Sequence, residues 1–312
     1  MLATLFHHIT LSSALFLLVF LGYLLMRIGK WPKDVANALS KFVFNVAVPA
    51  LLFNTMCRFS SLPPVDTRLL IAFFGSCVVV FIAGRLVAWK LFRLDGISQS
   101  VFALGGIYSN NVFLGIPLAK MTLGDEALPP VALIIAFNAL LLWTLVTIST
   151  EWALHGSLSV KGFSKTIKGV LTNPIVASIL LGLAWDFTGI PLPLVLKTPL
   201  QMTAQAAAPM ALIVLGMGLA EYGIREGWRE SIAITSLKLV LQPLVVWGLA
   251  VALGLPKLET QAIVMLASIS VAVNVYLMAD QFKTMKGPIA SSMVLSTILA
   301  AFTTPIAIAL TG

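Results

Sequence analysis

Two adjacent asparagines, Asn110 and Asn111, stand in the middle of a long apolar segment. Each amide offers two N–H donors and a carbonyl acceptor, and hydrocarbon supplies partners for neither. The same stretch holds other residues that are unfavourable inside an apolar helix: Gly105, Gly106, Ser109 and Pro117. Interrupted backbone at membrane depth is tolerated only where it is buried in protein or lines a wet cavity. The stretch from Leu104 to Ala119 is therefore predicted to form a binding site.

A second motif lies far downstream, where residues 274–277 (NVYL) echo residues 111–114 (NVFL). Two matching interruptions in two halves of a chain indicate a secondary transporter. Ser268 and Ser270 precede Asn274, and they either face the same site or bond back to their own helix. Asparagines in membrane bundles also serve as interhelical contacts, which is the alternative role for all three amides.

These residues are the predicted substrate-binding set: Gly105, Gly106, Ser109, Asn110, Asn111, Pro117, Ser268, Ser270 and Asn274. We expect no catalytic residue, metal or cofactor. The sequence contains no HExxH motif, no Walker-type loop and no acidic pair within a span, so an enzyme or an ATP-driven pump is not expected. The two cysteines, Cys57 and Cys77, have no neighbouring ligands that would suggest a zinc site or a disulfide framework.

The elements that must position these residues are membrane helices. The chain has 312 residues, of which 59% are hydrophobic and 10% charged, and its mean hydropathy is +1.00. These values indicate an integral membrane protein without a large soluble domain. The net charge of +8 comes from cations dispersed in ones and twos between apolar runs, which does not favour nucleic-acid binding.

Charged and Pro/Gly-rich breaks divide the chain into ten segments, each long enough to cross a hydrocarbon core of about 30 Å. The predicted spans are residues 9–28, 35–57, 68–92, 97–121, 128–152, 168–187, 199–221, 231–254, 259–281 and 287–310. The fold class is thus an all-α integral membrane protein embedded in the lipid bilayer.

The distribution of Lys and Arg sets the predicted orientation. Twelve of these cations follow odd-numbered spans, five follow even-numbered spans and three lie within spans. Cytoplasmic loops collect Lys and Arg, so both termini should face outward from the inner (plasma) membrane. Of the three within spans, Lys238 lies about two turns from a cytoplasmic end, and we expect it to snorkel.

The sequence also suggests two halves. The predicted organisation is a first five-helix repeat at 1–152, a cytoplasmic linker at 153–167 and a second repeat at 168–312. Several pairs share an offset of 160 residues: Leu21-Gly22 with Leu181-Gly182, Gly29 with Gly189, Asn45 with Gln205, and Pro49 with Pro209. The asparagine motifs match at an offset of 163. An odd number of spans in each half makes the repeats inverted.

Residues 109–117 (SNNVFLGIP) resemble the fourth helix of auxin efflux carrier family transporters, and residues 45–52 (NVAVPALL) and 237–244 (LKLVLQPL) extend the resemblance. It implies a fold related to bile-acid/sodium symporters, in which helices 4 and 9 are broken and cross at the site. It also implies a scaffold of helices 1, 2, 6 and 7, often dimeric, against which the remainder moves as an elevator. Plant members have a proline in both broken helices, whereas here the ninth span has none. Prokaryotic members are associated with malonate, malate and auxin-like acids.

The leading hypothesis is a secondary transporter of a small organic anion, built as a homodimer and coupled to protons or sodium. Asn111 and Asn274 should then meet at one cavity, where half-helix N-termini and neutral amides, rather than a buried Lys or Arg, hold the anion. One alternative is a non-transporting receptor or scaffold on the same fold. The other is a sodium-coupled bile-acid-type symporter, for which the sequence offers no acidic cluster within a span.

Overall fold

The structure is a computed structural model that describes residues 2–61, 64–155, 173–220 and 227–311. The described part of the first half contains α1 (Leu2–Arg27), α2 (Lys33–Phe42), η1 (Val43–Ala47), α3 (Val48–Met56), η2 (Phe59–Ser61), α4 (Arg68–Lys90), α5 (Gly96–Gly105), η3 (Asn111–Gly115), α6 (Ile116–Thr122), η4 (Asp125–Ala127) and α7 (Leu128–His155). The second half contains α9 (Pro174–Asp186), α10 (Leu194–Leu219), α11 (Trp228–Ser236), η5 (Leu237–Leu241), α12 (Gln242–Ala252), α13 (Lys257–Ser268), α14 (Val273–Gln281) and α15 (Lys286–Thr311). The described residues form no β-strand beyond one isolated bridge.

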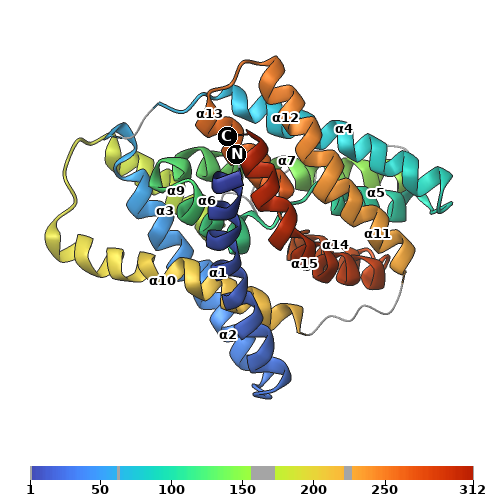
Figure 1. Cartoon of the computed structure of the whole chain (residues 1–312), viewed down its shortest axis with the longest axis horizontal. Coiled ribbons are helices and arrows are strands. Elements are labelled where there is room, and N and C mark those ends of the chain that lie inside the picture. Colours follow the sequence, from blue (N-terminus) through green and yellow to red (C-terminus); the bar gives the residue numbers. More distant parts are fainter. Residues whose placement is uncertain (1, 62–63, 156–172, 221–226, 312) are drawn as a thin grey trace.

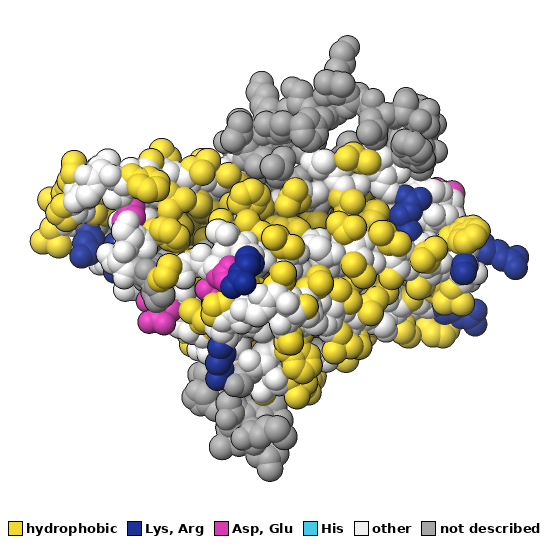
Figure 2. Space-filling model, turned by 90° about the horizontal axis from the view of Figure 1, so that it is seen from above, with side chains coloured by type: hydrophobic (Ala, Val, Ile, Leu, Met, Phe, Trp, Pro, Cys, Tyr) yellow, Lys and Arg dark blue, Asp and Glu magenta, His cyan; other side chains and the backbone are white. Residues whose placement is uncertain are grey.

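The all-helical fold class is confirmed within the described residues. Five of their helices are long and apolar enough to cross a membrane: Lys33–Met56, Arg68–Lys90, Leu194–Leu219, Trp228–Ala252 and Lys286–Thr311. Two shorter apolar helical segments are Leu15–Arg27, which is the later part of α1, and Pro174–Asp186, which is α9. Hydrophobic side chains are spread over the face shown in Figure 2, with few charged ones among them. Such a surface suits contact with lipid.

Some predicted boundaries were wrong. The predicted start of the sixth span, residue 168, lies outside the described residues. In the described part, α9 begins at Pro174, where the Asn173 side chain caps the first turn by accepting a hydrogen bond from the Ile175 N–H. The seventh was predicted from residue 199, but α10 begins at Leu194 and continues through Pro199 and Pro209. The predicted linker at 153–167 lies outside the described residues beyond His155.

Three helices widen into a π-helical turn just before a proline. The turns η1, η3 and η5 end two residues before Pro49, Pro117 and Pro243, respectively. Proline has no N–H and its ring crowds the carbonyl four residues earlier, so a wider turn accommodates it. Two of these turns, η3 and η5, carry Asn111 and Lys238. Asn111 and Lys238 therefore both lie in wide helical turns that precede a proline.

The helices pack in two groups. In the first group α10 packs against α1 and α3, and α3 packs against α9; this group lies at the left and bottom of Figure 1. In the second group α4 packs against α5 and α12, and α13 packs against α12 and α15. The groups meet where α1 contacts α15 and where α10 contacts η3. Of the two interrupted helices, α5, α13 and α14 pack with the second group, whereas η3 and α6 contact α1 and α10 of the first group.

Close helix contacts in the first group require glycine. A Cβ on Gly22 of α1 would lie 1.9 Å from the Ile213 carbonyl oxygen of α10. A Cβ on Gly182 of α9 would lie 3.0 Å from the Phe53 carbonyl oxygen of α3. Gly22 and Gly182 are 160 residues apart, and so are Phe53 and Ile213. The two contacts are therefore equivalent under the offset found in the sequence.

Candidate functional site

Two interrupted helices cross at the centre of the site. The chain leaves helix after α5 and again after α13, and residues 108–110 run antiparallel to residues 270–272. The Asn110 N–H donates to the Ser270 carbonyl over 3.0 Å, and the Ala272 N–H donates to the Tyr108 carbonyl over 3.0 Å. This pairing satisfies backbone groups that membrane depth would otherwise leave without partners. The second interruption is thus confirmed although it contains no proline.

A cavity of about 70 Å³ lies at this crossing. Its lining comes from both interrupted helices and from η1, α7 and the start of α9: Phe44, Tyr108, Ser109, Asn110, Asn111, Val112, Phe113, Ile135, Asn138, Asn173, Ile175, Val176, Ala272, Val273 and Asn274. Asn111 and Asn274 both line this cavity. None of the lining residues is charged, which leaves amides, hydroxyls and backbone groups to make polar contacts.

Several polar atoms at the cavity are buried without a hydrogen-bond partner in the protein. They are the Ser109 hydroxyl, the Asn110 Nδ2, both side-chain polar atoms of Asn111 and the Asn138 Oδ1. These four side chains are at most 5% exposed. Most buried polar groups in proteins are paired, and leaving one unpaired costs about 1–3 kcal/mol. A cluster at one cavity is therefore available to bind a polar ligand.

Asn274 differs from Asn111 because its amide already has a partner. Its Nδ2 donates to the Tyr108 hydroxyl over 3.0 Å. The bond links the first turn of α14 to the extended stretch after α5. Asn274 therefore combines a place in the cavity wall with an interhelical contact, whereas Asn111 has both amide atoms unpaired.

Three lining residues with polar side chains were not predicted: Tyr108, Asn138 and Asn173. Tyr108 lies next to the asparagine motif in sequence, so its polar hydroxyl could have been included in the predicted site. Asn138 is a lone amide in the apolar helix α7, and Asn173 precedes a proline as a helix cap. An isolated amide in an apolar segment has the same pattern whether it bonds a neighbouring helix or faces a ligand, so the sequence does not separate these roles.

Two predicted glycines do not line the cavity but allow close packing. A Cβ on Gly105 would lie 2.7 Å from the Ile234 Cγ2, and one on Gly106 would lie 3.0 Å from the Leu237 Cβ. Both therefore bring the end of α5 against α11 and η5. Pro117, also outside the cavity lining, is buried in the first turn of α6 and follows the π turn η3.

The two predicted serines also lie outside the cavity lining. The Ser268 hydroxyl donates to the Met265 carbonyl of its own helix, over 2.8 Å, which is the alternative role considered for it. The Ser270 hydroxyl is buried without a partner, and its carbonyl accepts the bond from Asn110. Both serines therefore belong to the crossing rather than to its cavity.

Lys238 does not snorkel, so that prediction was wrong. It is 0% exposed, and its Nζ donates to the Gln242 Oε1 over 2.7 Å and to the Ala267 carbonyl. Gln242 in turn donates from Nε2 to the Ile107 carbonyl over 3.0 Å. The π turn η5 lies against the crossing, where free backbone carbonyls accept these bonds. Snorkelling is not needed because the buried ammonium has polar partners.

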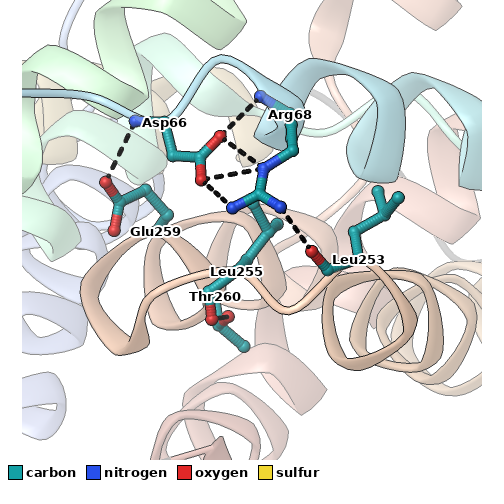
Figure 3. A network of polar contacts seen from close by, with 6 residues as sticks. All are labelled: Asp66, Arg68, Leu253, Leu255, Glu259 and Thr260. Carbon is teal, nitrogen blue, oxygen red and sulfur yellow. Dashed lines mark hydrogen bonds and ion pairs between the residues drawn. The ribbon is translucent and has the colours of Figure 1, made fainter.

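A second polar network fixes the far end of α13 (Figure 3). Arg68 pairs with Asp66 at 2.5 Å and donates to the Leu253 carbonyl over 2.9 Å, and the Asp66 N–H donates to the Glu259 Oε1 over 3.2 Å. Hydrogen bonding from Arg68 lowers the pKa of Asp66. Glu259 lies in the first turn of α13, where a negative charge is favourable. The network joins the chain before α4 to the α12–α13 connection.

Among the described residues, no group of three His, Cys, Asp or Glu side chains is placed to hold a metal ion. The cavity lining likewise contains no such side chain. The arrangement suits reversible recognition of a small polar molecule by neutral groups.

Comparison with known proteins shows a family of membrane transport proteins. A family model described as "Membrane transport protein" matches residues 9–308. A protein of Rhizobium meliloti (strain 1021) named "Putative malonate transporter" is 28% identical over 297 residues, covering 92% of this chain and 90% of its own length. An "Uncharacterized transporter" of Methanothermobacter thermautotrophicus is 26% identical, covering 93% of each chain. "Uncharacterized transporter YfdV" of Escherichia coli (strain K12) is 24% identical, also covering 93% of each chain.

Proposed function

Because this chain belongs to the membrane transport protein family, a family of transporters rather than enzymes, we propose that it is a secondary transporter of a small organic anion. The observation that carries the proposal is the cavity at the helix crossing. Unpaired amide and hydroxyl groups from residues 109–111 line it, together with Asn274 from the second interrupted helix. A carrier needs a site that binds without holding its substrate too firmly, and neutral groups suit that need.

The charge preference follows from helix direction. Both η3, which continues into α6, and α14 begin at the cavity, at Asn111 and Val273. The N-terminal end of a helix carries a partial positive charge and presents backbone N–H groups. In transporters with broken helices, such ends face anionic substrate groups. We therefore assign the cavity to a carboxylate, with Asn110, Asn111 and Ser109 as its side-chain partners.

The size of the cavity narrows the substrate class. A volume of about 70 Å³ holds a few water molecules, since one water needs roughly 10–15 Å³ on the same measure. This favours a compact mono- or dicarboxylate of malonate or malate size over a larger auxin-like acid. The name of the Rhizobium meliloti relative, "Putative malonate transporter", agrees with a malonate-sized substrate.

The proposed architecture is ten spans in two inverted repeats within the inner (plasma) membrane, with both termini extracytoplasmic. The equivalent contacts Gly22–Ile213 and Gly182–Phe53 support the repeat. The packing of α1, α3, α9 and α10 as one group supports a scaffold, through which two copies would form a homodimer. The second group would then move against this scaffold as an elevator that carries the crossing between the two sides.

The experiment is uptake of radiolabelled malonate, malate and monocarboxylates by proteoliposomes containing the purified chain, with and without an imposed proton or sodium gradient. We expect saturable uptake of at least one small carboxylate and competition among its close analogues. Protein-free liposomes are the control. Absence of flux for the whole panel, with a folded protein, would favour the receptor or scaffold alternative.

A further inference from the structure

Besides the cavity, the crossing holds a buried lysine, Lys238, which lies outside the cavity lining. Where α13 ends and just beyond the end of α5, the backbone carbonyls have no N–H of a following helical turn to bond. The Lys238 ammonium binds the Ala267 carbonyl of α13 directly and, through Gln242, holds the Ile107 carbonyl that follows α5. One side chain pair from η5 and α12 thereby reaches both interrupted helices.

The charge of a protonated Lys238 side chain matches the combined partial charge of two helix C-terminal ends. The C-terminal end of a helix is equivalent to roughly −0.5 of an elementary charge, so two such ends together offer about one negative charge. Lys238 supplies one positive charge at that position. Among the described residues no carboxylate forms an ion pair with Lys238. The partners that compensate its burial are therefore backbone carbonyls and the Gln242 amide.

A sodium ion would meet the same requirements. Carbonyl oxygens of unwound backbone and C-terminal ends of half-helices coordinate sodium in transporters that use this ion. Here the carbonyl oxygen of Ala267 already accepts from an ammonium, and that of Ile107 accepts from Gln242. The neighbouring Ser268 carbonyl accepts from the Thr304 hydroxyl over 2.9 Å. These oxygens are thus occupied by side chains.

We propose that Lys238 is a built-in cation that takes the place of a coupling sodium ion at the crossing, so that transport proceeds without sodium. This rests on the proposed transport function and specifies its energetics. Lys238 is a positioning residue: it holds the two half-helices in register, and Gln242 extends its reach. The proposal separates this chain from a sodium-coupled symporter built on crossing helices.

The first test uses the unmodified protein. Proteoliposome uptake of the best carboxylate is measured in sodium chloride and in choline chloride at equal ionic strength. The two initial rates should agree within about twofold, and the melting temperature in detergent should be the same in both salts. A rate that falls at least tenfold without sodium, or a sodium-specific rise in melting temperature, would overturn the proposal while leaving the transport function intact.

The second test empties the position. Lys238→Ala should melt at lower temperature in choline chloride, and sodium should raise that temperature by roughly 5 °C at saturation, as expected for binding of an ion only to the folded state. Lys238→Met, which fills the space without charge, and Lys257→Ala, at the exposed other end of α13, should show no such rise. A simple structural role predicts the same loss for Lys238→Ala with no sodium rescue, and that result rejects the proposal.

If Lys238→Ala does not fold, the sodium response of the unmodified protein decides. Absence of carboxylate flux in every salt would refute the transport function, but the melting measurements would still test the cation site.

Discussion

The two interrupted helices reach the same crossing by different means. The first, α5–η3–α6, carries three residues with unpaired polar side-chain atoms at the cavity, and it resumes through a π turn before Pro117. The second, α13–α14, has no proline, and Asn274 already bonds to the Tyr108 hydroxyl. The first interruption therefore presents free groups to a ligand, whereas the second is held mainly by other parts of the protein.

The support of the second interruption comes from distant helices. The Ser296 hydroxyl of α15 accepts the Val271 N–H over 3.0 Å, and the Thr304 hydroxyl, also of α15, donates to the Ser268 carbonyl. Lys238 donates to the Ala267 carbonyl. Each bond satisfies a backbone group that the end of α13 or the extended chain leaves outside a helix. Unwinding here is thus a property of the packed structure rather than of local composition.

The largest effect that separates the two helices should come from Asn111. Asn111→Ala should lower the initial rate of carboxylate uptake by roughly tenfold to hundredfold, the equivalent of one or two ligand hydrogen bonds. Its melting temperature should change little, because both side-chain amide atoms are unpaired in the structure. Uptake in proteoliposomes and thermal unfolding in detergent measure the two effects.

The matched control is Asn274→Ala, which also alters the cavity wall. It should reduce uptake as well, but unlike Asn111→Ala it should lower the melting temperature, because it removes the bond to Tyr108. If both variants transport at the parent rate, the amides are only interhelical contacts. If Asn111→Ala is the more destabilised of the two, the division of roles between the two helices is wrong.

The difference between the helices also explains what the sequence could predict. The first interruption was predictable because Gly106, Asn110 and Pro117 are each locally unfavourable in an apolar helix. The second depends on hydroxyls of α15 that bond to backbone groups from 25 to 36 residues away in sequence. No local pattern encodes such contacts. The echo of the asparagine motif located the second interruption, but only the structure shows how it is maintained.

The packing around two other residues was not evident from the sequence. Gly105 was predicted to bind substrate; it lies outside the cavity lining, and its lack of a Cβ leaves room for Ile234. Lys238 was predicted to reach the membrane surface, but η5 packs its side chain against the crossing, where it is buried. In both cases the residue type alone did not indicate these contacts. The direction in which the position faces is set by tertiary packing and was not available from the sequence.

An intermediate effect should follow from removing the support of the second interruption. Ser296→Ala leaves the buried Val271 N–H without its acceptor, which should cost about 1–3 kcal/mol of folding free energy. The melting temperature should fall, and uptake should fall with it as the crossing loosens. Ser292→Ala, one turn earlier in α15, is the control, because its hydroxyl donates to the Ile289 carbonyl of the same helix rather than to the second interruption. Equal melting temperatures for the two variants would show that α15 does not hold the interruption.

The smallest effect concerns how the two interrupted helices begin. Asp95 caps α5 by accepting hydrogen bonds from the Ile97 and Ser98 N–H groups and from the Ser98 hydroxyl, whereas α13 begins after Pro256 without a side-chain cap. Hydrogen bonding from Ser98 lowers the pKa of Asp95 below its ordinary value of 3.8. A lowered pKa in the folded state means that the ionised cap stabilises the protein above that ordinary value, and this contribution is lost as the pH falls through the folded-state pKa.

Asp95→Ala should therefore cost about 1 kcal/mol at neutral pH, and the difference from the unmodified protein should shrink as the pH is lowered into the acidic range. Asp95→Asn keeps a capping side chain without a titrating group, so it should retain most of the stability and show a weaker dependence on acid. Melting temperatures measured from about pH 7 to about pH 3 distinguish the three proteins. If Asp95→Ala is as stable as the parent at neutral pH, the start of α5, like that of α13, does not depend on a side-chain cap, and the two helices differ mainly at the crossing.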